Sequence, residues 1–353
     1  MQLKRLIYTV VLTVGAFACL QADALSININ PLSSLGLPAN APALAAFQRA
    51  AHRWESHISD PVSVNIDADL RNLGSSSIIG QASSVLLGAS HDFMRSLVVA
   101  DAASETDDGI VAALPTATQF SVSLPSGFAK SGFLIGTKAN IKALGITGLD
   151  SQFGSNDATI EFNSSFSFDF DNSNGVTAGM TDFETVAAHE IGHALGFVSQ
   201  VDRIDFLLNQ SGNPSSITGV SPTLLDLFRF STDPSLNPTN STEFTNLPRE
   251  LRPGQEAVFD DLNNEYALAT GAFVGDGDQA SHWKDDNGNP LLHIGIMDPT
   301  LAPGQSFDIT SADLRALDVI GYDIASVPLP GGALLMLSAL GLLGLVGGKR
   351  DSH

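Results

Sequence analysis

The stretch His189-Glu190-Ile191-Gly192-His193 decides more about this chain of 353 residues than any other. On an α-helix, residues four apart lie one turn apart on the same face, so His189 and His193 can present two imidazoles to one metal ion. Glu190 lies beside the first of these ligands, where its carboxylate can take a proton from water that the metal activates. The pattern therefore predicts a zinc site with Glu190 as general base. A buried helix whose histidines only form hydrogen bonds is the alternative.

The residues around this motif favour a helix. Thr181 and Glu184 have the spacing of a capping box at its start. The positions between the cap and the second histidine are largely apolar, and Gly196 can end the helix. We therefore expect the two histidines on one helix.

A hydrolytic zinc site has three protein ligands and one open position, so a third ligand must come from elsewhere in the chain. The sequence has eight histidines, which makes the candidates few. Four lie far upstream or in the terminal tail: His52, His57, His91 and His353. The downstream candidates are His282 and His293, and a carboxylate could also serve, of which Asp202 is the nearest.

The order His189-Glu190-x-x-His193-x-x-Gly196 resembles the start of the metzincin zinc signature, in which a glycine turns the chain toward a ligand three residues later. That position here is Ser199, a poor zinc ligand, so the short form of the signature is broken. The chain is more similar to leishmanolysin-like metzincins. In these a long insertion separates the helix from a distant third histidine, which a methionine turn and a helix follow.

Three later segments carry this second resemblance, and they come in the expected order: Ala280-Ser281-His282-Trp283, then Gly295-Ile296-Met297-Asp298-Pro299, then a predicted helix within 309–322 that ends in Gly-Tyr. The same order is similar to a group of secreted bacterial metalloproteases that carry the sequence HEIGHALGF. The resemblance covers about residues 40 to 325. It implies His282 as the third zinc ligand and Met297 as an apolar floor beneath the metal, with Asp202 or His293 as the open alternatives.

The expected fold is α+β: a two-lobed, metzincin-like zinc protease. A twisted mixed sheet and the zinc-binding helix form a first lobe over about 40–197, and a mostly irregular lobe over about 198–326 ends in a helix. Apolar spacing predicts a helix over 45–54 and strands over 62–68, 119–124 and 158–170, the last with a bulge or turn at 163–165. The strands before the zinc helix could hold an extended substrate by edge pairing, or could be core strands only.

Polar composition marks residues 209–255 as an insertion between the zinc helix and the third-ligand region. Its apolar segment, 224–230, is expected to pack onto the core. Asp-rich loops raise calcium as a second metal, although none completes an EF-hand. The candidate oxygen ligands are Asp169, Asp171, Asn172 and Asn174, or Asp276 and Asp278, or Asp285, Asp286 and Asn289.

Both ends of the chain carry signals rather than parts of the fold. Residues 1–24 read as a secretory signal peptide, because Lys4 and Arg5 precede an apolar run and Ala22-Asp23-Ala24 fits a cleavage site. A lipoprotein signal at Cys19 is the weaker alternative. Residues 327–353 resemble a PEP-CTERM sorting signal of the VPLPA variant, with an apolar span and a basic Lys349-Arg350 tip. This implies a Gram-negative-type bacterium, an exosortase-like processing partner, and a secreted or cell-surface protein; a permanent tail anchor is the alternative.

Composition limits the partners. A net charge of −21 and an isoelectric point near 4.4 argue against nucleic acid and anionic membranes. The only cysteine is Cys19, so the mature chain is expected to lack disulfides and a cysteine-based form of latency.

The combined pattern predicts a secreted, monomeric zinc endopeptidase of residues 25–326 that acts on protein or peptide substrates. Two other functions stay open. One is a surface or matrix binding protein with a degenerate zinc site, which Ser199 favours. The other is a zinc hydrolase of non-peptide amides. No transition-state donor stands out, and Tyr322 is a candidate only because the chain has three tyrosines.

Overall fold

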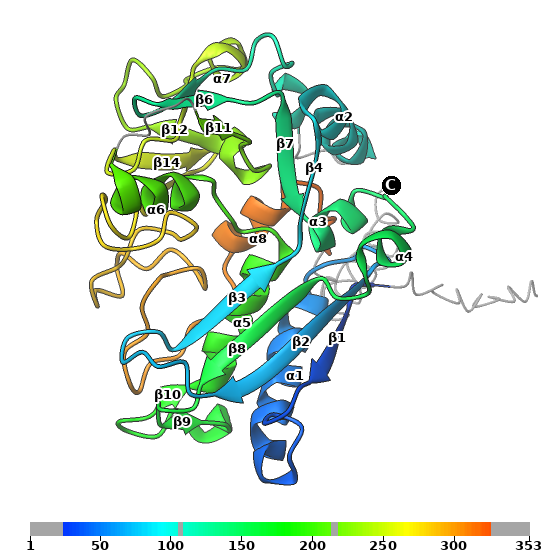
Figure 1. The fold of residues 1–353 in the computed structure, drawn as a ribbon, viewed down its shortest axis with the longest axis vertical. Coiled ribbons are helices and arrows are strands. Elements are labelled where there is room, and N and C mark those ends of the chain that lie inside the picture. The colour runs from blue at the N-terminus through cyan, green and yellow to red at the C-terminus, as the bar shows by residue number, and fades with distance from the viewer. Residues whose placement is uncertain (1–23, 105–108, 213–217, 326–353) are drawn as a thin grey trace, which may run out of the picture.

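The computed structural model of the chain describes residues 24–104, 109–212 and 218–325 (Figure 1). The fold is α+β with a mixed sheet, as predicted. The helices are α1 (Ala41–Glu55), α2 (His91–Asp101), α3 (Lys138–Ala143), α4 (Leu149–Phe153), α5 (Phe183–Leu195), α6 (Val201–Ser211), α7 (Ser241–Asn246) and α8 (Ser311–Asp318). The strands are β1 (Ser26–Pro31), β2 (Ser63–Arg71), β3 (Gly80–Ser84), β4 (Leu86–Ser90), β5 (Val122–Ser123), β6 (Phe128–Lys130), β7 (Phe133–Thr137), β8 (Ala158–Asn163), β9 (Phe168–Asp169), β10 (Thr181–Asp182), β11 (Thr218–Val220), β12 (Arg229–Ser231), β13 (Arg249–Glu250), β14 (Ala257–Asp260) and β15 (Glu265–Leu268).

The main sheet has the order β1-β2-β8-β3. Strands β1, β2 and β8 run parallel, whereas β3 is antiparallel to β8 and forms one edge. The central strands form because their apolar residues alternate: Val64, Ile66 and Ala68 of β2 are buried, as are Ile160 and Phe162 of β8. The predicted strands over 62–68 and the first part of 158–170 are confirmed, and Asn163 begins the expected turn.

Helices α1 and α5 lie together against one face of this sheet (Figure 1). The apolar side of α1, including Ala46, Ala50 and Trp54, is buried as its spacing predicts. The Trp54 indole N–H donates to the backbone oxygen of Ala188 in α5 at 2.8 Å. Because an unpaired buried polar group costs about 1–3 kcal/mol, this bond fixes how the two helices lie against each other.

The start of α5 differs from the predicted capping box. The N-cap is Asp182, whose carboxylate accepts the Thr185 amide at 3.1 Å and the Thr185 hydroxyl at 2.6 Å. Thr181 cannot be the cap because it pairs with Phe168 in the β9–β10 ladder, and Glu184 binds Arg49 at 2.8 Å instead. The predicted end of the helix at Gly196 is confirmed; its φ of +143° is a conformation that favours glycine.

Two regions of the first half differ from the prediction. The strand predicted over 119–124 is only β5, because Phe120 closes a turn onto Thr116 and the chain becomes extended only at Val122. The sheet also begins earlier than residue 40, since β1 pairs with β2 from Ser26 onward. Strand β5 pairs with β13 and strand β6 pairs with β11, so this part of the chain joins elements that follow α5.

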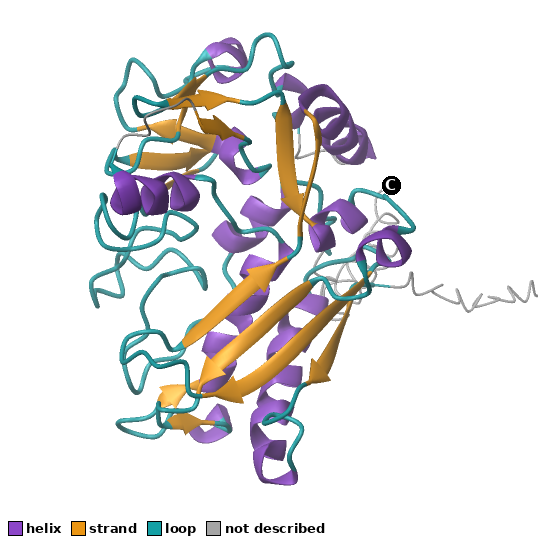
Figure 2. Cartoon of the chain, viewed as in Figure 1, coloured by secondary structure: helices purple, strands orange, loops and turns teal. Residues whose placement is uncertain are grey.

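The segment from 269 to 310 contains neither helix nor ladder strand, as Figure 2 shows between β15 and α8. Its backbone carbonyls need other donors. Arg229, fully buried, donates to the carbonyls of Glu250, Ala269 and Ala280 at 3.1, 2.7 and 3.3 Å. A single guanidinium thus ties this segment, at Ala269 and Ala280, to strand β13 at Glu250.

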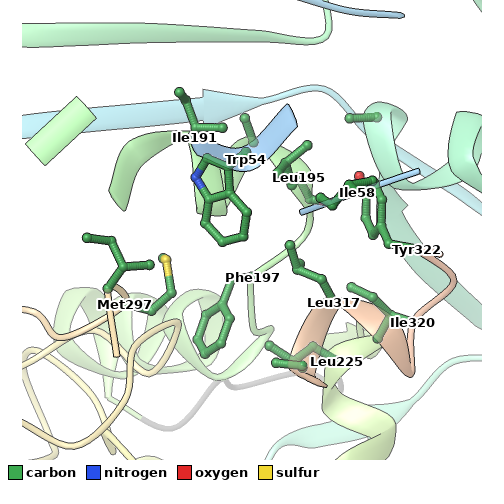
Figure 3. Packing of buried hydrophobic residues seen from close by; sticks show 14 of the residues in the cluster. Trp54, Ile58, Ile191, Leu195, Phe197, Leu225, Met297, Leu317, Ile320 and Tyr322 are labelled. Atoms are coloured by element: carbon green, nitrogen blue, oxygen red, sulfur yellow. The ribbon is translucent and has the colours of Figure 1, made fainter. Parts of the chain in front are cut away.

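A continuous core joins α5 to α8. Figure 3 shows Trp54, Ile191, Phe197 and Met297 gathered on one side of Leu317 of α8. The expected helix within 309–322 forms as α8, with a capping box between Thr310 and Asp313, but it ends at Asp318, before Gly321 and Tyr322. Residues 224–230 are buried, as expected of an apolar segment within the insertion.

No helix among the described residues is both long and apolar enough to cross a bilayer. The predicted signal peptide lies outside the described residues except for Ala24, and the predicted sorting segment lies wholly outside them.

Candidate metal centre

Three histidine side chains converge at the carboxyl-terminal half of α5. The Nε2 atoms of His189 and His193 are 3.2 Å apart, and the Nε2 atom of His282 lies 3.1 Å from the first and 3.2 Å from the second. His282 reaches them from a loop 89 residues beyond His193. The structure therefore brings together the three residues that the sequence singled out as zinc ligands.

Each ring is oriented by a backbone carbonyl. His189 Nδ1 contacts the Ile296 oxygen at 2.8 Å, His193 Nδ1 contacts the Phe197 oxygen at 2.8 Å, and His282 Nδ1 contacts the Gln279 oxygen at 2.9 Å. A carbonyl oxygen can only accept, so each Nδ1 carries the proton. The Nε2 atoms consequently hold lone pairs, and all three lone pairs are available to one cation.

Burial keeps these rings neutral. Removal from water lowers the pKa of His189 to about 3, with a further lowering from His193. The same burial lowers the pKa of His193 to about 4 and that of His282 well below its usual value. At neutral pH the three rings thus present nitrogen lone pairs at 3.1–3.2 Å from one another, and these repel unless a cation lies between them.

The triad fits zinc. Tetrahedral angles and Zn–N bonds of about 2.0–2.1 Å place ligand nitrogens about 3.3–3.4 Å apart. The observed separations are shorter by only about 0.2 Å. Hydrolytic zinc sites have three protein ligands and leave the fourth position to water or substrate, whereas structural zinc sites have four protein ligands.

Glu190 follows the first histidine in α5 and is 5% exposed. Desolvation raises the pKa of its carboxyl group to about 8. Strand β3 passes close by, because a Cβ atom added at Gly80 would lie 2.7 Å from Glu190 Oε1. The other end of β3 also touches α5, since the Ser84 hydroxyl donates to the His193 carbonyl at 3.2 Å. The edge strand therefore runs past both the acid and the second histidine.

Met297, the predicted floor of the metal site, packs against Gly192 of α5. It is fully buried, and a Cβ atom added at Gly192 would lie 2.3 Å from its sulfur. Gly192, between the two histidines on α5, thus leaves the space that the methionine fills. The residue before Met297, Ile296, supplies the carbonyl that orients His189.

Asp202, the alternative third ligand, holds the His282 loop instead. Its carboxylate accepts the amides of Ala280 at 2.5 Å and Ser281 at 3.2 Å, and also binds the Ser281 hydroxyl. Burial raises the pKa of Asp202 to about 6, against the opposing effect of these hydrogen bonds. It does not belong to the histidine group because its oxygens are directed to the backbone that precedes His282.

Ser199 also helps to hold the loop that carries His282. Its hydroxyl donates to Asp226 at 2.6 Å, and its amide donates to the Ser281 hydroxyl at 2.8 Å. The chain after Gly196 is thus tied to the loop that carries His282. Ser199 therefore links the segment after α5 to the loop that carries His282 through hydrogen bonds.

The remaining candidates lie elsewhere. Tyr322 donates from its buried hydroxyl to the Leu195 carbonyl at 2.7 Å, so it packs against α5. In the first loop suggested for calcium, Asp169 accepts the amides of Asp171 and Thr177. In the second, Asp276 binds Lys284 at 2.9 Å. These carboxylates have protein partners, and calcium stays a prediction for them.

Sequence patterns missed the groups that support the triad. The edge strand β3 has little apolar alternation, and Gly80 therefore gave no signal. Asp202 and Asp226 hold their neighbouring segments by accepting hydrogen bonds from backbone amides, and residue spacing in the sequence does not reveal such bonds. His293, the other alternative ligand, lies apart from the triad in a group with Asp286 and Asp298. The chain matches no protein-family model, no curated protein and no solved structure.

Proposed function

We propose that this chain is a zinc-dependent endopeptidase of metzincin type, with His189, His193 and His282 as zinc ligands and Glu190 as general base. The observation that carries the proposal is the convergence of three neutral, carbonyl-oriented imidazoles beside a buried carboxylate. A zinc ion held there supplies Lewis acidity, which polarises a peptide carbonyl and acidifies water.

Glu190 performs the proton transfers in this scheme. Its carboxylate accepts a proton from the attacking water and then donates it to the amine that leaves when the peptide bond breaks. A group that must both accept and donate works best with a pKa near the working pH. Burial of Glu190 moves its pKa in that direction.

The edge strand β3 supports a peptide substrate. Its inner edge pairs with β8, which leaves the other edge free of strand pairing among the described residues. An extended peptide added at that edge would run along α5, past Glu190 near Gly80 and past His193 near Ser84. Main-chain hydrogen bonds of this kind accept any sequence, which suits an endopeptidase. The sequence signals at both ends support an exported enzyme.

The test is casein hydrolysis by the purified full chain with zinc, beside Glu190→Gln and Glu184→Gln. Both variants keep the side-chain volume and lie on α5, but only the first removes the proposed base. Glu184 lies in the first turn of α5, where it binds Arg49. We expect Glu190→Gln to lose about 10²–10⁴ in rate and Glu184→Gln to keep most activity. Circular dichroism and zinc content confirm that the variants are folded and loaded.

Three other outcomes would count against the proposal. Equal activity in the wild type and Glu190→Gln would remove Glu190 from the mechanism. Tight zinc binding without hydrolysis of any protein would favour the surface-binding alternative. Turnover of acyl amides with no peptide cleavage would favour a non-peptide hydrolase.

A further inference from the structure

A second group of metal-ligating side chains lies in the loop between His282 and Met297 and just beyond it. Asp286, His293 and Asp298 each offer one ligand atom, and these atoms lie within 4.8 Å of one another. His293 Nδ1 is 3.4 Å from Asp286 Oδ2 and 3.7 Å from Asp298 Oδ2. Apart from the histidine triad, this is the only such group of three or more His, Cys, Asp or Glu side chains in the described part of the chain.

Backbone amides hold both carboxylates in place. Asp286 Oδ1 accepts the Gly288 amide at 2.6 Å, and Asp298 Oδ1 accepts the Thr300 amide at 2.9 Å. The second oxygen of each carboxylate is directed toward His293, although Asp298 Oδ2 also accepts the Asp286 amide at 3.2 Å. The two side chains are 5% and 0% exposed, so they form a fixed, buried pair rather than a surface cluster.

The ring nitrogens of His293 have no hydrogen-bond partner among the described residues. Both Nδ1 and Nε2 are buried. The ring stacks on Phe307, with centroids 3.9 Å apart, which fixes its plane. A charged histidine bonded to a carboxylate would sit at about 2.7–2.9 Å from its acceptor. The separations here are closer to the spacing of about 3.3–3.5 Å for nitrogen and oxygen ligands around one zinc ion.

The charge of the group also calls for a cation. Asp286 and Asp298 bring two buried carboxylates together beside His293. The neighbouring lysine, Lys284, is directed to Glu256 and Asp276 at 2.9–3.2 Å. A divalent ion bound by two carboxylates and a neutral imidazole would give a neutral site, which removes the cost of two buried like charges.

We propose that Asp286, His293 and Asp298 form a second metal site, and that its ion is zinc. Imidazole nitrogen selects zinc and related transition metals over calcium and magnesium, which prefer oxygen. The site would close the loop that runs from the third histidine to the methionine turn. Asp298 directly follows Met297, and Ile296 orients His189, so the ion would fix the backbone on which the first zinc ligand depends.

The test is the zinc content of the full chain, measured by elemental analysis after dialysis against metal-free buffer. We expect two equivalents in the wild type, one in His293→Gln, one in His282→Ala and none in the double variant. Asp286→Asn is the second probe of the site, because it keeps the side-chain volume and the acceptor for Gly288, and it is expected to hold one equivalent. His91→Gln is the matched control: His91 is also buried with unpartnered ring nitrogens, but belongs to no such group, and the variant should keep two.

The outcomes separate this inference from the proposed function. Two equivalents in folded His293→Gln or Asp286→Asn would overturn the second site. A single wild-type equivalent that His282→Ala removes and His293→Gln retains would also overturn it, and would leave the proposed enzyme intact. A single equivalent lost in His293→Gln and kept in His282→Ala would support the second site and count against the histidine triad as a zinc centre.

Discussion

Gly192 offers a sharp test of the packing between α5 and Met297. It lies inside α5, where alanine normally stabilises a helix by about 1 kcal/mol relative to glycine. Here the added Cβ would lie 2.3 Å from Met297 Sδ, 3.3 Å from Met297 Cε and 3.4 Å from Trp54. Met297 and Trp54 are fully buried, so neither can move away freely. Overpacking of this kind costs about 1–3 kcal/mol.

The two effects oppose each other, and the clash is the larger. We therefore expect Gly192→Ala to destabilise the chain by about 1 kcal/mol. Met297→Ala alone is expected to cost about 2–5 kcal/mol through the cavity it leaves. In that background the clash with Met297 is gone, so Gly192→Ala should become stabilising by about 1 kcal/mol.

The assay is urea unfolding of the four proteins of this double-mutant cycle, in the presence of a chelator so that zinc affinity does not enter. A change of sign between the two backgrounds is the predicted result, because it isolates the contact between residues 192 and 297. If Gly192→Ala stabilised the wild type, or had the same effect in both backgrounds, the methionine would not fill the space beside the glycine and the reasoning would be refuted.

Three further outcomes are expected. Asp202→Ala should weaken zinc binding about 10- to 100-fold in a chelator competition, because Asp202 only positions His282; complete loss of the ion would instead make it a ligand. Burial is the main cause that raises the carboxyl pKa of Asp60 to about 7. Between about pH 4 and 7 the folded chain therefore binds one more proton at Asp60 than the unfolded chain does, so the free energy of unfolding falls by about 1.4 kcal/mol for each pH unit as the pH rises. Unfolding curves of Asp60→Asn should therefore show a flatter pH dependence than the wild type, and an unchanged slope would contradict this. Tyr322→Phe should keep full peptidase activity while losing about 1 kcal/mol of stability with the bond to Leu195; a loss of rate in a fully folded variant would show a catalytic role.

The parts of the site that the sequence predicted are those that local geometry controls. His189 and His193 share a helix face because the helical repeat alone sets their spacing. The strands β2 and β8 were predicted because apolar alternation marks a half-buried strand. His282 could be named as a candidate because the chain has few histidines. Its position beside the other two histidines, however, depends on Asp202, which accepts the backbone amides of Ala280 and Ser281.

Other features could not be predicted because partners far along the chain determine them. Strand β3, with the sequence GQASS, is extended because it pairs with β8 some 80 residues later. The capping box failed for a similar reason, since Thr181 is held in a ladder with Phe168. Asp286, His293 and Asp298 have no helical or strand spacing, and a loop without ladder bonds brings them together.

The buried Arg229 has a consequence for how this chain can vary. It binds the backbone oxygens of Glu250, Ala269 and Ala280, and every amino acid supplies such an oxygen. The path of the backbone at these points therefore does not depend on which side chains it carries. Residues 269 and 280 can change wherever there is space for a different side chain. Arg229 itself cannot be exchanged for lysine, which lacks a planar group with several fixed donors. The sequence is therefore constrained at one position, Arg229, whereas a sheet would constrain many positions. The loop that carries His282 can change in sequence and still hold this histidine in the same place.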